Sequence, residues 1–396
     1  MRPWVPLVVA AAASAVAQAF GRFTYPLLLT TIQEDFGVSY TVAGGLASVN
    51  LVAYLVGTAA VTWLASKWVP GAILRFGLVI STVGLIGLAL SPGPIPLGIG
   101  LLVTGFAGAL IWVPAPAVGA SLLPPRLRGL GFGSMGAGIG LGVVAAGLLA
   151  IPLRAQPDPS AWRILYAVEA AVAVVVVVVA FVVLRRPTGA ALAVTGVRMS
   201  AIRTVPRWVA ILVAYAAFGL SYSWFINFLV AMLEDDRGVT ATSASVVFLI
   251  VGAATIPGGV IIGRISDAVG RRPTMMVGFA AMAAGALGAR YAPPWLLYPC
   301  VVLFGLAFSG VPTTIAAYLG DHTEPGEFPA AFGVATLAFG IAQMLAPQVG
   351  GIVGDVTGGF TAVFIASAAA AGVGALAASR LELVNRGRTR PGPAPG

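Results

Sequence analysis

The sequence has almost no cysteine or histidine and very little charge. Its 396 residues include one cysteine, Cys300, and one histidine, and charged residues make up 9% of the chain, against roughly 25% in a typical globular domain. A single cysteine excludes an internal disulfide bond. One histidine and one cysteine also leave metal sites and His- or Cys-based catalytic centres short of ligands. We therefore expect no metal, no cofactor and no enzymatic activity.

Apolar residues take the place of the missing charge. Hydrophobic residues make up 59% of the chain, and the mean hydropathy is +0.99. Apolar runs of about 20 residues, the length that crosses a ~30 Å hydrocarbon core, occur about twelve times. Such runs must form helices, because lipid offers no partner for unsatisfied backbone groups. The composition predicts an all-α integral membrane protein with about twelve transmembrane helices.

The chain also repeats itself at an offset of about 200 residues. Gly57 has a counterpart in Gly258, and Val113-Pro114 recurs as Val311-Pro312. A duplicated set of long apolar segments is typical of membrane transporters. We expect two pseudo-symmetric six-helix bundles, residues 1–190 and 207–384. A basic cytoplasmic linker, residues 191–206, joins them, and a disordered cytoplasmic tail, residues 385–396, follows the second bundle.

The few basic residues are unevenly distributed between the loops. When the loops are assigned alternately to the two sides of the membrane, 17 of the 22 Lys and Arg residues fall on one side. By the positive-inside rule this side is cytoplasmic, and so are both termini. We interpret the net charge of +9 as orientation and attraction to membrane lipids rather than nucleic-acid binding. The predominance of Arg over Lys favours the inner (plasma) membrane of a bacterium.

One loop carries a specific motif. Residues 263–273 read Gly-Arg-Ile-Ser-Asp-Ala-Val-Gly-Arg-Arg-Pro, between the predicted eighth and ninth helices. They resemble the Gly-x-x-x-Asp-x-x-Gly-Arg-Arg/Lys signature of the major facilitator superfamily (MFS). Residues 21–57 are also similar to a poorly characterised bacterial branch of that superfamily. The residues that match the signature are Gly263, Asp267, Gly270, Arg271 and Arg272.

The resemblance implies a secondary transporter with the MFS fold, in which two bundles expose a site near the midplane alternately to each side. It also implies that the motif is a gating loop, whose carboxylate pairs with an arginine and faces a helix N-terminus. A tight cytoplasmic turn with arginine anchors is the simpler interpretation. In the first half Ser66 stands where Asp267 stands in the second, so we expect the gating to be asymmetric.

Arg22 is an unusual residue for a spanning helix, where an unpaired cation costs several kcal/mol. We favour a position in a central cavity, which the superfamily lines with its first, fourth, seventh and tenth helices; snorkelling to the membrane surface is the alternative. Because arginine pairs with carboxylates in a bidentate manner, the first hypothesis for the solute is a small organic anion. Drug or metabolite efflux is the alternative, and a non-transporting sensor or a membrane enzyme is a remote one.

Further polar and aromatic residues on or beside these helices form a pool of substrate-binding candidates. Taken singly, each is as well explained by a hydrogen bond between helices or by an interfacial aromatic ring. Two of them lie one and a half turns apart and are not expected to face the cavity together, Tyr222 and Asn227. With Arg22, the pool contains Tyr25, Asn50, Trp112, Tyr222, Asn227, Thr313 and Gln343.

Two prolines and one carboxylate complete the predictions. Pro114 and Pro312 occupy matching points of the fourth and tenth helices, where we expect each to break or kink its helix. Glu169 is placed within the sixth span. Pairing with one of three arginines is our preferred interpretation, and binding of a coupling proton is the alternative; the three arginines are Arg22, Arg154 and Arg163. The expected partners are a small-molecule substrate, a coupling ion such as the proton, and lipid, with the protein acting as a monomer.

Overall fold

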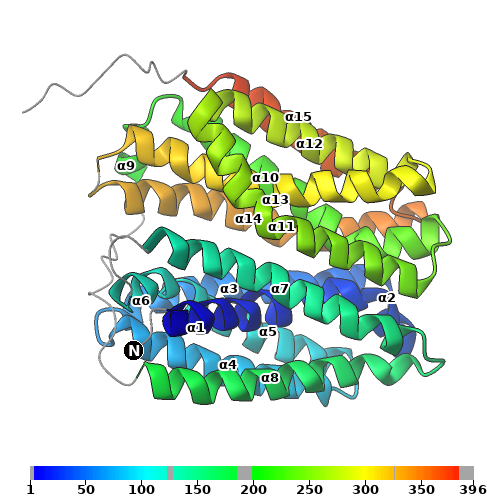
Figure 1. Ribbon diagram of the computed structural model, residues 1–396. Helices are drawn as coiled ribbons and strands as arrows, with labels where there is room; N and C mark the ends of the chain where they lie inside the picture. Colours follow the sequence, from blue (N-terminus) through cyan, green and yellow to red (C-terminus); the bar gives the residue numbers. More distant parts are fainter. Residues whose placement is uncertain (1–3, 123–127, 185–198, 325, 383–396) are drawn as a thin grey trace, which may run out of the picture.

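The computed structural model describes residues 4–122, 128–184, 199–324 and 326–382. The predicted tail (385–396) and the first half of the predicted linker (191–198 of 191–206) lie outside these residues. Within them the chain is helical and has no strand. Two bundles lie side by side in Figure 1, the first half below and the second half above.

The first half consists of six spans, of which the first changes helix type and the fourth is interrupted between α5 and α6. Its elements are α1 (Trp4–Ser14), η1 (Ala15–Phe23), α2 (Thr24–Phe36), α3 (Tyr40–Leu64), α4 (Pro70–Ala89), α5 (Pro94–Trp112), α6 (Ala115–Leu122), α7 (Arg128–Arg154), η3 (Pro159–Ala161) and α8 (Trp162–Val183). The segments α1, η1 and α2 form one continuous span, in which η1 is a π-helix. The sequence did not predict this change of helix type.

The second half repeats the pattern. Its elements are α9 (Met199–Arg203), α10 (Trp208–Ala231), η4 (Met232–Asp236), α11 (Ala241–Val269), α12 (Arg271–Tyr291), α13 (Pro294–His322), α14 (Phe328–Thr357) and α15 (Thr361–Ser379). Across the described residues, eleven spans are long and apolar enough to cross a membrane. Helix α12, with 21 residues and arginines in its first and last turns, completes the twelve by its place between α13 and α15.

The repeat is visible in the turn that follows the first span of each half. Gly37 and Gly238 end these spans in the left-handed region, at φ values of 60° and 64°, which glycine adopts without steric cost. Two residues later Ser39 and Thr240 accept a hydrogen bond from the backbone N–H three positions on, and so cap α3 and α11. The sequence repeat Gly-Val-Ser/Thr is therefore a helix stop followed by a helix start.

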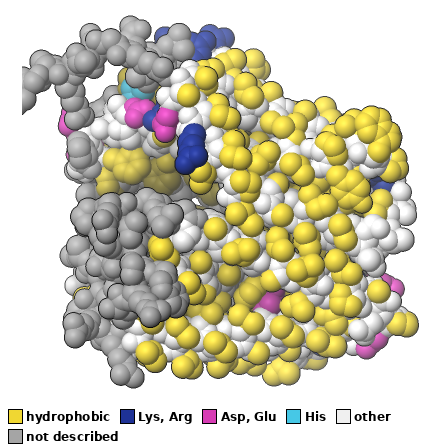
Figure 2. Space-filling model, viewed as in Figure 1, with side chains coloured by type: hydrophobic (Ala, Val, Ile, Leu, Met, Phe, Trp, Pro, Cys, Tyr) yellow, Lys and Arg dark blue, Asp and Glu magenta, His cyan; other side chains and the backbone are white. Residues whose placement is uncertain are grey.

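The two halves meet along three pairs of helices: α7 with α11, α3 with α14, and α2 with α10. Small residues allow the close approach. A Cβ atom on Gly140 or Gly252 would collide with a side chain of the facing half, and one on Gly351 with the Tyr40 carbonyl oxygen. Apolar side chains cover most of the outer face in Figure 2, and most charged ones lie at its two ends, as expected for a protein surrounded by lipid.

The predicted helix break is found at Pro114 but not at Pro312, where a kink stays a prediction. Helix α5 ends at Trp112 and α6 begins at Ala115, so the chain is interrupted at Pro114, but α13 continues through Pro312. Around Pro312 the hydroxyls of Thr313 and Thr314 donate to backbone carbonyls four residues back, at 2.8 and 3.0 Å. Such side-chain bonds support a helix that lacks one backbone donor. The first half instead has a second proline, Pro116, two residues later.

The described end of the predicted linker is ordered rather than extended. Helix α9 covers Met199–Arg203, with Ala201 and Ile202 buried, and it packs against α14. The linker therefore contributes a short docked helix to the second half.

Candidate functional site

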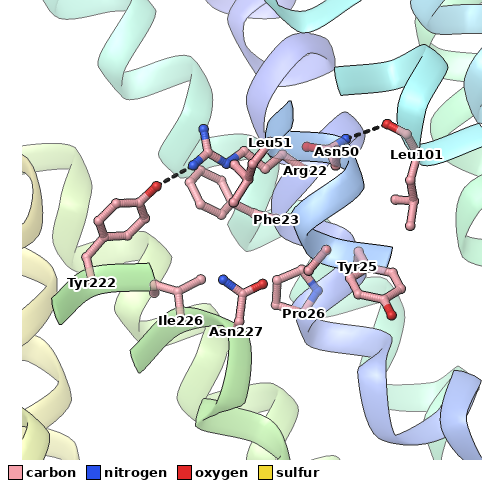
Figure 3. Close-up of a pocket in the computed structure, with 11 residues that line it drawn as sticks. Arg22, Phe23, Tyr25, Pro26, Asn50, Leu51, Leu101, Tyr222, Ile226 and Asn227 are labelled. Carbon is pink, nitrogen blue, oxygen red and sulfur yellow. Dashed lines mark hydrogen bonds between the residues drawn. The ribbon is translucent and has the colours of Figure 1, made fainter. Parts of the chain in front are cut away.

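A small cavity lies between the two halves, in the middle of the molecule. Its volume is about 20 Å³, which suits roughly one water molecule. The first half contributes residues of η1, α2, α3 and α5, and the second half contributes residues of α10 (Figure 3). The lining residues are Arg22, Phe23, Tyr25, Pro26, Ala47, Asn50, Leu51, Leu101, Tyr222, Ile226 and Asn227.

Arg22 lines this cavity and reaches across to the second half. Its Nη2 atom donates to Gln343 Oε1 at 2.6 Å and to the Tyr222 hydroxyl, and the Tyr222 hydroxyl donates to the same Gln343 oxygen. The guanidinium also lies 5.5 Å from the ring centre of Phe23 and 6.0 Å from that of Tyr54. No carboxylate of the described residues forms an ion pair with Arg22. Among the described residues, its positive charge contacts neutral oxygens and aromatic rings.

Three other members of the predicted pool border the cavity but make bonds that support the helices. Asn50 Nδ2 donates to the carbonyl oxygens of Gly21 and Leu101, at 2.9 and 2.8 Å. The Tyr25 hydroxyl points away from the cavity (Figure 3) and donates to the Ala43 carbonyl oxygen at 2.8 Å. Asn227 donates to a carbonyl of its own helix. These contacts fix the backbone around Arg22.

The structure brings some of the pool together and leaves two members elsewhere. Gln343, on α14, is buried and bonds Arg22, although it is not among the lining residues. Tyr222 and Asn227 both line the cavity, contrary to the expectation that they could not face it together. Trp112 packs against the apolar core, and Thr313 is exposed and donates to the Ser309 carbonyl oxygen. These two residues are not at the cavity.

The expected ion pair of Glu169 is absent from the described residues. Glu169 is 1% exposed, and its Oε1 accepts a hydrogen bond of 2.5 Å from the Thr24 hydroxyl. Its Oε2 is buried without a partner. The arginines that were expected nearby bind other groups, since Arg163 pairs with Asp35 and Arg154 with Glu234. The apolar packing of this side of the first half keeps the carboxyl away from these cations.

In the predicted gating loop, ion pairs of Arg271 link three helices, α11, α12 and α13. Gly270 joins α11 to α12 at a φ of 106°, which favours glycine. Arg271 Nη1 lies 2.5 Å from Asp267 Oδ1 on α11, and its Nε lies 2.8 Å from Asp321 Oδ2 on α13. Asp321 was not predicted as a partner. The feature of the sequence that could have indicated it is the position of this carboxylate at the end of α13, next to His322.

The remaining loop predictions have smaller roles. Arg272 forms no ion pair within the described part of the chain, and the backbone of Gly263 faces the Thr313 methyl group. In the first half Ser66 donates to the Trp63 carbonyl oxygen, and Lys67 lies 4.0 Å from the Trp63 ring centre. Ser66 thus caps its own turn where Asp267 binds an arginine.

Comparisons with known proteins agree with the helix arrangement and the loop. The family model described as "Uncharacterised MFS-type transporter YbfB" matches residues 14–379. The chain belongs to this family. The chain is also similar to an uncharacterized MFS-type transporter YybF of Bacillus subtilis, with 26% identity over 128 residues. That match covers 31% of this chain and 32% of the relative's length.

Solved structures of other MFS proteins share the fold of this MFS-type transporter. A D-xylose–proton symporter is 17% identical, with a TM-score of 0.77 over 95% of this chain and 96% of that chain. A bacterial homologue of the human lysosomal transporter Spinster, in an inward-facing and unoccupied conformation, is 15% identical, with a TM-score of 0.73 over 96% and 95%. At this level of identity the likeness concerns the fold.

The end of this MFS-type transporter opposite the gating loop is sealed by contacts between its halves. We call it the outer end, because the charge distribution predicts that it faces away from the cytoplasm. Arg154 of α7 pairs with Glu234 of η4 at 2.7 Å, and Thr30 donates to the same carboxylate at 2.8 Å. The backbone N–H groups of Tyr40 and Thr41 donate to Asp355 of α14, at 3.0 and 2.7 Å. These bonds close the central cavity on this side.

The sequence analysis missed this outer seal. The feature of the sequence that could have indicated it is the acidic run Glu234-Asp235-Asp236. This run lies in the π-helix η4 at the end of the seventh span. Asp235 accepts a hydrogen bond from the Tyr40 hydroxyl, and Asp236 accepts one from the Phe360 backbone N–H at 2.9 Å. Each of these three consecutive carboxylates thus binds a different part of the chain.

Proposed function

We propose that this MFS-type transporter is a secondary transporter of a small organic anion, which binds at Arg22 and is moved by alternating access. The observation that supports this proposal is the environment of Arg22, a half-buried cation between the two halves whose hydrogen-bond partners among the described residues are neutral. A carboxylate that replaced the oxygens of Tyr222 and Gln343 would gain a charge-assisted, bidentate contact.

The same contacts suggest how substrate binding and gating are connected. Arg22 belongs to the first half, and Tyr222 and Gln343 belong to the second, so the cavity is closed by hydrogen bonds across the interface. An anion that takes these positions on Arg22 loosens that connection. In our proposal the present structure is the state sealed on the outer side, and the 20 Å³ cavity widens when the halves rock apart.

A ligand screen tests the proposal. The melting temperature of the detergent-purified protein is measured with small carboxylates, sugars, amino acids and cationic drugs; a ligand at 100 times its Kd stabilises by about 2.7 kcal/mol. We expect carboxylates to raise the melting temperature of the wild type but not of Arg22→Gln. Arg75→Gln is the matched control, because Arg75 faces the Phe181 ring at 5.1 Å, away from the cavity. A shift that survives in Arg22→Gln contradicts the anion site.

Drug or metabolite efflux is the second candidate function. The aromatic residues around the cavity favour it, since Phe218, Tyr222, Phe308 and Phe339 stack or tilt against each other within 6.0 Å. Such a cluster suits flat apolar compounds. Stabilisation by cationic or bulky apolar compounds alone, unchanged in Arg22→Gln, would favour efflux.

A further inference from the structure

We propose that Glu169 binds a proton and that this proton stabilises the π-helical turn that carries Arg22. The inference rests on the proposed function, because it gives the transporter a residue for its coupling proton. Glu169 lies on α8, outside the cavity lining, and its carboxyl contacts Thr24, two residues after Arg22. The proton would act on the substrate site through the backbone.

The surroundings of Glu169 favour the neutral acid. Helix α8 packs against α1, η1, α2, η3, α4 and α7. A buried carboxylate without a counter-charge is costly, and such a group is neutralised by a proton instead. No described charged side chain on these elements pairs with it. The charged side chains of these elements have other surroundings: Arg22 binds Tyr222 and Gln343, Arg75 faces Phe181, Arg154 binds Glu234, Asp35 binds Arg163, and Glu34 is exposed. Two phenols also lie nearby. The Tyr25 hydroxyl donates to the Ala43 carbonyl oxygen, and the Tyr166 hydroxyl is buried and has no hydrogen-bond partner among the described residues.

The Thr24 hydroxyl connects the carboxyl to the π-turn. Its oxygen lies 2.5 Å from Glu169 Oε1 and 3.3 Å from the Ala19 carbonyl oxygen. A hydroxyl has one hydrogen to donate. When Glu169 is protonated, its O–H donates to Thr24 and the Thr24 hydroxyl donates to Ala19. When Glu169 is ionised, the Thr24 hydrogen turns to the carboxylate, because a charge-assisted bond is stronger, and Ala19 loses this partner.

The Ala19 carbonyl is the acceptor that defines the end of the π-helix. The backbone N–H of Thr24 also donates to it, five residues back along the chain. The hydroxyl and the N–H of Thr24 therefore hold the same carbonyl, and both bonds keep the turn wide. π-Turns are rare and occur mostly as single turns at functional sites. Return to an α-helix would shift the register by one residue, about 100° of rotation, and would turn Arg22 away from Tyr222 and Gln343.

Infrared spectroscopy tests the protonation itself. The carbonyl band of a protonated carboxylic acid is recorded at neutral pH for purified wild type, Glu169→Gln and the control Glu234→Gln, whose carboxylate is paired with Arg154. We expect the band in the wild type and in Glu234→Gln, and its loss in Glu169→Gln. A band of equal intensity in wild type and Glu169→Gln, or no band in the wild type, overturns the inference.

Amide hydrogen exchange of residues 15–24 tests the connection to the turn. After correction for the intrinsic pH dependence of exchange, we expect raised pH to speed exchange in the wild type roughly fivefold, the effect of one hydrogen bond. Glu169→Gln, which donates to Thr24 at every pH, should stay protected. Thr24→Val should exchange quickly at every pH, and Thr24→Ser should behave like the wild type. Equal pH responses in wild type and Glu169→Gln contradict the connection.

Neither measurement needs an anion. If both succeed while carboxylates fail to bind, the proton site stands and the proposed substrate is wrong. If carboxylates bind at Arg22 and the infrared band does not depend on Glu169, the transporter function stands and this inference is wrong.

Discussion

The outer seal offers the sharpest test of how the two halves are held together. Arg154 is 2% exposed at its side chain and Glu234 is 16% exposed, and the two form an ion pair across the interface. Arg154 also donates to Thr30, Thr31 and Ser245. We predict that Glu234→Gln favours the state in which the halves separate at the outer end, because it leaves a buried cation with neutral partners only.

The size of the effect follows from the geometry. Breaking a buried pair typically costs about 3–5 kcal/mol, but glutamine keeps one acceptor and Glu234 is partly exposed, so we take about 1.5–3 kcal/mol, the range for a hydrogen bond to a charged group. Since about 1.4 kcal/mol is a factor of ten, the outward-open fraction should rise roughly 10- to 150-fold. The Arg154 guanidinium is hydrated when the halves part, which is why the cost falls on the sealed state.

Thiol accessibility measures this fraction. Ser48 accepts a hydrogen bond of 3.1 Å from the Gln348 backbone N–H across the interface, so Ser48→Cys in a Cys300→Ser background places one thiol inside the seal. Its labelling rate with a charged, membrane-impermeant maleimide should rise with Glu234→Gln. Asp35→Asn is the matched control, because it breaks a pair of the same length with Arg163 inside the first half. Equal rates in Glu234→Gln and wild type would refute the reasoning.

Three further variants test the gate, the interface and the support of the cavity. Asp267→Asn should slow turnover several-fold more than Ser66→Ala in a transport assay, because only Asp267 binds an arginine; equal effects would contradict asymmetric gating. Gly44→Ala should lower the melting temperature through about 1–3 kcal/mol of overpacking against a backbone oxygen of α14, whereas Gly87→Ala, with open space around it, should not. Asn50→Leu should destabilise by about 0.5–1.5 kcal/mol for each hydrogen bond lost, as measured by thermal unfolding.

The fold was predictable because it depends on the composition of the chain and on the length of its apolar runs. Apolar runs of membrane-spanning length fix the helices, and the repeat Gly-Val-Ser/Thr marks equivalent turns in both halves. The Asp267–Arg271 pair was predictable because both residues belong to one short motif, and the gating role of this loop stays a prediction. The family comparison confirms the superfamily assignment.

The contacts between distant segments were not predictable from the sequence. Nothing in the order of residues shows that η1 is a π-helix, because helix type depends on which carbonyl each N–H selects. The arginines Arg154 and Arg163 were plausible partners for Glu169, yet each is taken by a carboxylate from another turn. Pro114 interrupts its helix whereas Pro312 does not, and their matching positions in the repeat gave no sign of this difference.

The two halves differ in where they carry charged residues, because several charged positions of one half have no charged counterpart in the other. The first half holds two ionisable residues, the half-buried Arg22 and the buried Glu169, on or against the π-turn of its first span. The second half holds the carboxylates of the gating loop and, in η4, those of the outer seal. In the proposed mechanism the substrate site of the first half contacts the second half through the hydrogen bonds of Arg22 with Tyr222 and Gln343. Gln343→Leu removes one of these two bonds without changing any charge, so it should leave the ion pairs of the loop and of the outer seal intact and weaken their response to a carboxylate ligand.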